Sequence, residues 1–123
     1  MRFPLSREIN MIKIYHNNRC SKSRCGLEIL ENSKKDFEVV KYLDDKLSVN
    51  ELKAIISKLG IQPIELVRKN EAIWKSEYKG KDLTDAQIIS AMVEHPKLIE
   101  RPIVINGDKA VIGRPTELIL NII

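Results

Sequence analysis

The chain has 123 residues, of which 43% are hydrophobic and 31% are charged, and its formal net charge at pH 7 is +4. This length fits one domain that buries roughly two-thirds of its unfolded surface, and interleaved charges of both signs argue against a disordered chain. The lysines stand beside glutamates and form no stripe with stacking aromatics, which argues against nucleic acid as a partner. The positive excess suits a small anion at least as well.

Two cysteines occur in the chain. We find no secretory signal, so the thiols are expected to stay reduced in the cytoplasm. Residues 1–10 contain no apolar run of the length that a signal peptide or membrane span requires, and no membrane association is expected. We expect these ten residues to be a loosely ordered N-terminal extension and residues 11–123 to form a single folded domain.

The first predicted element is a short β-branched strand at residues 12–15. Apolar residues at helical spacing then predict a helix from about residue 21 to residues 32–33, and residues 37–42 predict a second strand. A strand, a helix and a parallel strand imply a right-handed β-α-β unit.

The middle of the chain reads as helical. A capping box at residues 48–51 starts a helix, and Gly60 follows the end of its apolar stripe. Residues 61–78 fit short helices and turns better than one long element. A second capping box at residues 84–87 starts another helix, which stops before Pro96.

The last third returns to strands. Residues 103–105 and 110–112 flank Asn106 and Gly107, and this pattern predicts a β-hairpin. An amphipathic helix is expected over residues 118–122. Together these elements predict an α/β fold, a four-stranded mixed sheet flanked by helices with a helical insertion. Strands and helices follow one another in the order found in thioredoxin-like and glutaredoxin-like proteins.

The residue with the strongest chemical signal is Cys20. It lies between the carboxyl end of the first predicted strand and the amino end of the first helix, where free amides and the helix dipole stabilise a thiolate or an oxyanion. His16, Arg19, Lys22 and Arg24 add positive or donor groups nearby, so a lowered thiol pKa is expected. An inert, buried Cys20 is the alternative, and its polar neighbours argue against it.

Cys25 is predicted to pack inward, four residues before Ile29 on the same helix. A disulfide between Cys25 and Cys20 is disfavoured, because five helical residues advance about 7.5 Å and bridged α-carbons lie within roughly 7 Å. A loop conformation at Cys20 would shorten this separation, so the pairing stays open.

Three arginines far apart in the sequence are candidates for an anion site: Arg68, Arg101 and Arg114. Arginine offers a fixed fork of donors that matches oxyanion geometry and stays charged. Arg101 and Arg114 flank the predicted hairpin, so the fold can bring them to the sheet end that carries Cys20. The Arg101–Pro102 bond, just before a strand, is a candidate cis peptide.

Together these motifs resemble the glutaredoxin-coupled ArsC arsenate reductases and their ArsC-like relatives, over about residues 11–123. The resemblance rests on Ile14-Tyr15-His16-Asn17 before Cys20, on Ser23-Arg24, on Leu66-Val67-Arg68-Lys69-Asn70, on His95-Pro96, on Arg101-Pro102-Ile103-Val104 and on Gly113-Arg114-Pro115.

The resemblance implies that Cys20 is the nucleophile and that His16 helps to keep it ionised. Ser23 would take part in substrate binding, and Pro102 would be cis. The arsenate-binding arginines would be Arg68, Arg101 and Arg114. In such enzymes the thiolate attacks arsenate, glutathione attacks the cysteine–arsenic adduct, and glutaredoxin removes the mixed disulfide as arsenite leaves. Glutathione and glutaredoxin are thus the implied reductants, with no metal or bound cofactor.

Two departures bear on the substrate. Asn18 stands where the arsenate reductases usually have proline, and residues 20–24 read Cys-Ser-Lys-Ser-Arg in place of Cys-Gly-Thr-Ser-Arg. This loop resembles that of an ArsC-like branch of the family, so an oxyanion other than arsenate stays open as the substrate. A phosphatase-like reductase would need arginine at position 26, which is Gly26.

Two alternatives to an arsenate reductase are a transcriptional regulator and a zinc-binding protein. An Spx-like transcriptional regulator shares the fold and binds RNA polymerase, but its Cys-x-x-Cys switch would need a cysteine where this chain has Ser23. The three arginines also favour oxyanion chemistry over it. A zinc site would need His95 to approach His16, Cys20 and Cys25 from some seventy residues away. His95 fits the end of a helix better.

Overall fold

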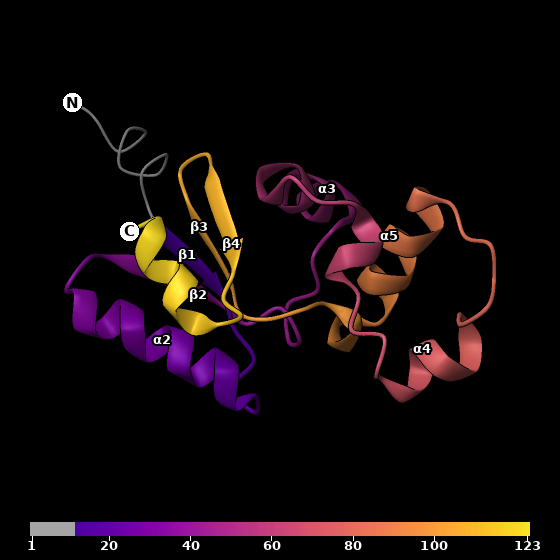
Figure 1. Cartoon of the computed structure of the whole chain (residues 1–123), viewed down its shortest axis with the longest axis horizontal. Helices are drawn as coiled ribbons and strands as arrows, with labels where there is room; N and C mark the ends of the chain where they lie inside the picture. The colour runs from indigo at the N-terminus through magenta and orange to yellow at the C-terminus, as the bar shows by residue number, and fades with distance from the viewer. Residues whose placement is uncertain (1–11) are drawn as a thin grey trace. The chain divides into compact units, whose positions relative to one another are not determined.

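The computed structural model describes residues 12–123, and the expected N-terminal extension at residues 1–10 lies outside them. The described chain forms two compact units (Figure 1). The sheet unit comprises residues 12–42 and 101–123, and the helical unit comprises residues 43–100. The expectation of a single domain over residues 11–123 stays a prediction.

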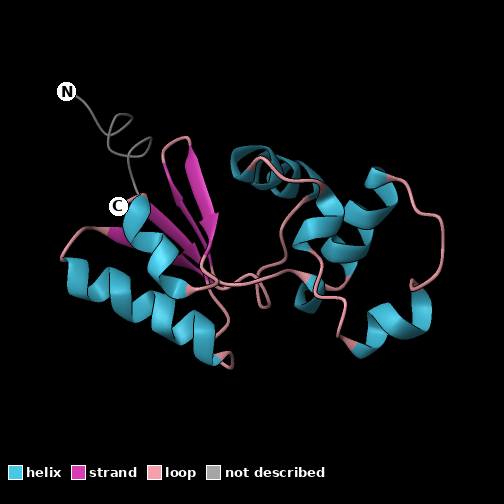
Figure 2. Cartoon of the chain, viewed as in Figure 1, coloured by secondary structure: helices cyan, strands magenta, loops and turns pink. Residues whose placement is uncertain are grey.

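The sheet unit contains the predicted four-stranded mixed sheet (Figure 2). Its order is β2-β1-β3-β4, with β1 parallel to β2, and β3 antiparallel to both β1 and β4. The strands are β1 (Ile12–Tyr15), β2 (Phe37–Val40), β3 (Ile103–Asn106) and β4 (Lys109–Ile112). The predicted β-α-β unit and the predicted hairpin are both confirmed, and Gly107 in the hairpin turn has the positive φ of 65° that glycine tolerates.

Helix α2 (Ser21–Ser33) packs against the 3-10 helix η3 (Thr116–Asn121). Ile119 of η3 is fully buried with the core residues of β1, α2 and β3, namely Ile12, Ile14, Leu30 and Val104. The amphipathic α-helix expected at the end of the chain is therefore wrong in type. The amides of Leu118 and Ile122 bond three residues back, to Pro115 and Ile119, which is the 3-10 pattern of a short terminal segment.

The helical unit contains α3 (Val49–Leu59), η1 (Pro63–Leu66), α4 (Ala72–Glu77), α5 (Asp85–Glu94) and η2 (Pro96–Leu98). Both predicted capping boxes are present: Ser48 with Glu51 starts α3, and Thr84 with Gln87 starts α5. Gly60 ends α3 with a φ of 68°. The short helices predicted for residues 61–78 are also confirmed. Within residues 12–123, no helix is long and apolar enough to cross a membrane.

Candidate active site

The loop between β1 and α2 places Cys20 as the N-cap residue of α2. Asn17 organises this loop from a buried position. Its carbonyl accepts a hydrogen bond from the Cys20 amide at 3.0 Å, and its Oδ1 accepts one from the Arg19 amide at 3.0 Å. From the other side, the Arg24 guanidinium donates to the Asn18 carbonyl at 2.9 Å. The half-buried sulfur is thus carried on a loop with a fixed backbone.

Two arginines from the far end of the chain meet this sulfur. Arg114, two residues after β4, donates from Nη2 to Cys20 Sγ at 3.6 Å and from Nε to the Arg101 carbonyl at 2.8 Å. Arg101, two residues before β3, is only 8% exposed, and its side chain also hydrogen bonds to Cys20. The prediction that the fold brings Arg101 and Arg114 to Cys20 is confirmed.

The pKa of Cys20 is lowered from the ordinary thiol value. Burial by itself raises the pKa, but the Ser23 amide, the Arg101 guanidinium and the Lys22 amide outweigh it. The sulfur completes no capping hydrogen bond to the helix. The amides of the first turn nevertheless favour its charged form, as expected at a helix N-terminus.

His16 and Ser23 form a buried pair beside Cys20. His16 Nδ1 lies 2.7 Å from Ser23 Oγ, which accepts a hydrogen bond from the Asn17 amide at 2.9 Å. Burial lowers the pKa of His16, the Ser23 contact raises it, and the cations Lys41 and Arg24 lower it further. The net lowering keeps His16 neutral at pH 7, so it adds no positive charge, and its contact with Ser23 links it to the loop. The predicted substrate contact of Ser23 stays a prediction.

Cys25 is exposed, so the prediction that it packs inward is wrong. The buried face of α2 consists of Ser23, Gly26 and Leu30, and Cys25 falls outside that stripe. Both cysteines are free thiols.

Arg68 belongs to the helical unit, where it has its own partners. Its Nε lies 3.4 Å from Glu71 Oε2 and its Nη1 lies 3.3 Å from Glu100 Oε1. The Arg68 amide donates to the Leu98 carbonyl at 2.7 Å, beside a β-bridge between Val67 and Ile99. Its predicted role in anion binding stays a prediction.

Pro102 is cis, as predicted, and the Arg114–Pro115 bond is also cis. Sequence reasoning missed the second bond, although a proline directly after a candidate site arginine was a signal for it. It named Asn17 only as part of a motif and did not predict its burial or its hydrogen bonds in the loop, because these depend on tertiary packing. Within residues 12–123, no group of three or more His, Cys, Asp or Glu side chains is placed to hold a metal ion.

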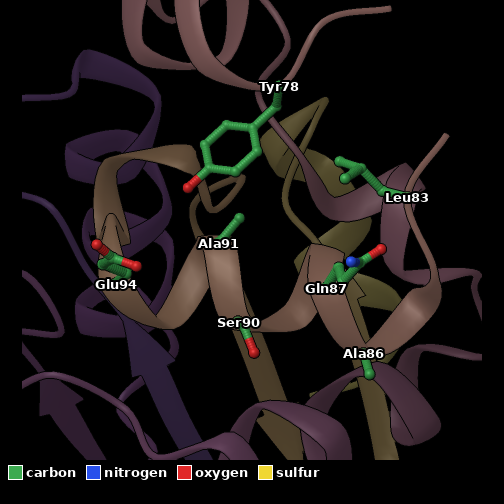
Figure 3. Close-up of a pocket in the computed structure, with 7 residues that line it drawn as sticks. All are labelled: Tyr78, Leu83, Ala86, Gln87, Ser90, Ala91 and Glu94. Carbon is green, nitrogen blue, oxygen red and sulfur yellow. The ribbon is translucent and has the colours of Figure 1, made fainter. Parts of the chain in front are cut away.

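An open pocket in the helical unit is a weaker candidate site (Figure 3). Tyr78 reaches over α5, from which Gln87, Ser90 and Glu94 project. Burial raises the pKa of Tyr78, and the nearby carboxylates of Glu94 and Glu77 raise it further. The pocket lining contains no thiol, imidazole or cationic side chain, so it supplies neither the nucleophile nor the anion-binding groups that surround Cys20.

Comparisons with known proteins identify the family of the chain. The ArsC family model matches residues 15–122. The chain is 48% identical over 112 residues to an arsenate reductase of Haemophilus influenzae, covering 89% of this chain and 97% of that protein. It is 42% identical over 114 residues to the uncharacterized protein YfgD of Escherichia coli, covering 91% and 96%.

A solved structure has the same fold. The arsenate reductase from Vibrio cholerae superposes with a TM-score of 0.88 at 43% identity, covering 92% of this chain and 98% of that one. With the family match, the shared fold and the thiol–arginine site in place, the chain belongs to the ArsC family.

Proposed function

We propose that this protein is an arsenate reductase in which Cys20 is the nucleophile. One observation carries the proposal: the guanidinium groups of Arg101 and Arg114 both contact the Cys20 sulfur. A thiolate and two fixed cationic forks at one point suit a tetrahedral oxyanion, because the forks bind its oxygens while the sulfur faces its central atom. The arsenate reductases among the relatives of the chain support arsenate as that oxyanion.

The proposed chemistry begins at the sulfur. The Cys20 thiolate forms a bond to As(V), and one arsenate oxygen takes up protons and leaves as water. Arg101 and Arg114 stabilise the negative oxygens during this step. Arg68 is proposed as a third anion-binding arginine by resemblance to the family.

Glutathione then completes the reduction. Its thiolate attacks the Cys20 sulfur, a sulfur–sulfur bond forms, and the electron pair of the sulfur–arsenic bond passes to arsenic, which leaves as arsenite. The glutaredoxin thiolate then attacks the glutathione sulfur of the mixed disulfide, so that a disulfide between glutaredoxin and glutathione forms and Cys20 leaves as the thiolate. Both external thiols belong to a reducing compartment, so the proposed location is the cytoplasm.

The test is oxidation of NADPH driven by arsenate in the presence of glutathione, glutaredoxin and glutathione reductase. Cys20→Ser is expected to abolish the arsenate-dependent rate, because serine is far less nucleophilic than a thiolate. Cys25→Ser is the matched control and is expected to keep the rate, since Cys25 is exposed and lies outside the site. Equal rates in wild type and Cys20→Ser would remove Cys20 from the mechanism. No rate in the wild type would reject arsenate as the substrate.

A further inference from the structure

The three chain segments that carry the site meet at a contact between two glycines and one proline. Gly26 lies in α2, six residues after Cys20, Pro102 follows Arg101, and Gly113 precedes Arg114. A Cβ atom added to Gly26 would lie 2.8 Å from Pro102 Cγ, and one added to Gly113 would lie 2.9 Å from the same atom. We call Gly26, Pro102 and Gly113 the glycine–proline contact.

Space, and not backbone conformation, requires glycine at both positions. The described glycines with positive φ are Gly60, Gly80 and Gly107, and neither Gly26 nor Gly113 is among them. Gly26 even lies inside a helix, where alanine is the better helix former. A new Cβ at either position would approach Pro102 Cγ closer than side chains normally pack. A proline ring can change its pucker but cannot swing away from the contact, because it is closed onto its own backbone nitrogen.

A shift of Pro102 would displace both arginines, because short hydrogen bonds and one peptide bond connect them to this proline. The Gly113 amide donates to the Pro102 carbonyl at 2.7 Å, and the Arg114 Nε donates to the Arg101 carbonyl at 2.8 Å. Arg101 is joined directly to Pro102. The position of the proline ring is therefore linked to the two cationic groups that contact Cys20.

We propose that Gly26 and Gly113 are positioning residues that set Arg101 and Arg114 against the Cys20 sulfur by admitting the Pro102 ring between them. The effect on the thiol stands on the site geometry alone, and the effect on arsenate rests on the proposed function.

The test uses Gly26→Ala and Gly113→Ala in a Cys25→Ser background, so that iodoacetamide alkylates only Cys20. Both variants are expected to react about three-fold more slowly at pH values below the thiol pKa, the change that a pKa higher by about half a unit produces there. Arsenate is expected to protect Cys20 from alkylation only at concentrations on the order of ten-fold higher, the cost of one misaligned charge-assisted hydrogen bond. KM for arsenate should rise together with the arsenate concentration that protects Cys20.

Ile12→Val is the matched control. Ile12 lies in the same core cluster as Ile119. The Ile119 Cδ1 atom is 3.1 Å from both added Cβ atoms, whereas no atom of Ile12 is among the three nearest to either of them. It is expected to lower stability to urea without changing the alkylation profile. A second variant, Gly26→Ala with Ile119→Val, relieves the Ile119 contact alone and is expected to keep the raised thiol pKa.

Unchanged alkylation of Cys20 in a folded alanine variant would overturn the proposal, as would an equal change in Ile12→Val or full recovery in the Ile119→Val double variant. If one alanine variant does not fold, the alkylation of Cys20 in the other alanine variant tests the proposal. Alkylation needs no arsenate turnover, so loss of the proposed function and loss of this proposal give different results.

Discussion

The two units place their arginines in opposite electrostatic surroundings. In the sheet unit, the guanidinium groups of Arg101 and Arg114 contact a thiol. In the helical unit, Arg68 lies between the carboxylates of Glu71 and Glu100. Each carboxylate offsets part of its charge and occupies donors of its fork. The same residue type therefore has a different capacity for anions in each unit.

The largest expected effect tests this difference directly. Arg101→Lys keeps the charge and loses the fork, so kcat/KM for arsenate should fall on the order of 10- to 100-fold, or about 1.5–3 kcal/mol. Alkylation of Cys20 by iodoacetamide should change much less, since lysine still stabilises the thiolate. Parallel losses of both would contradict an anion-binding role for Arg101.

Arg68→Lys is the companion measurement. Because Glu71 and Glu100 already engage Arg68, a smaller fall in kcat/KM is expected, about three-fold at the scale of a partly screened contact. A fall as large as that of Arg101→Lys would erase the contrast between the two units and show that Arg68 holds the anion as directly.

A change confined to the helical unit should affect stability and spare the chemistry. Ser48→Ala removes the side chain that accepts from the Glu51 amide at 3.1 Å, and it should lower the free energy of unfolding by about 1 kcal/mol in urea titrations. Ser57→Ala, an exposed position inside the same helix, is the control and should cost less than about 0.5 kcal/mol. Neither variant should alter Cys20 alkylation.

The smallest effect is a pH dependence in the sheet unit. Burial lowers the pKa of His16 below its ordinary 6.5, so the unfolded chain binds the proton more readily than the folded one. The stability that His16 contributes is therefore complete above pH 6.5 and is lost as the pH falls through the lower folded value. In urea titrations the difference between wild type and His16→Asn should shrink as the pH falls over this window. A difference that is constant with pH would show that His16 titrates alike in both states.

Features set by neighbours in the chain could be predicted from the sequence. The two capping boxes, the glycine after α3 and the hairpin all follow from residues a few positions apart, and all are present. The place of Cys20 at a helix start is of the same kind, because a strand, a loop and a helix occur in sequence. The meeting of Arg101 and Arg114 with Cys20 followed from the predicted topology, although their contacts did not.

Features set by packing could not be read in this way. Cys25 has the spacing of a core residue, yet the buried face of α2 contains Ser23, Gly26 and Leu30, and Cys25 is exposed. The final segment has an apolar pattern suited to an α-helix, but it forms 3-10 turns around one buried anchor, Ile119. The charge state of His16 depends on burial and on Lys41 and Arg24, which come together only in the fold.

Cys20 at the start of α2 also matters for the end of the proposed cycle. A thiol of lower pKa is a better leaving group in thiol–disulfide exchange. The Ser23 amide and the Arg101 guanidinium, which favour the charged sulfur before it attacks arsenic, therefore also favour its departure when a second thiol attacks its mixed disulfide. In the proposed cycle, one helix start would thus assist both the first bond that Cys20 makes and the last bond that is broken to regenerate its thiolate.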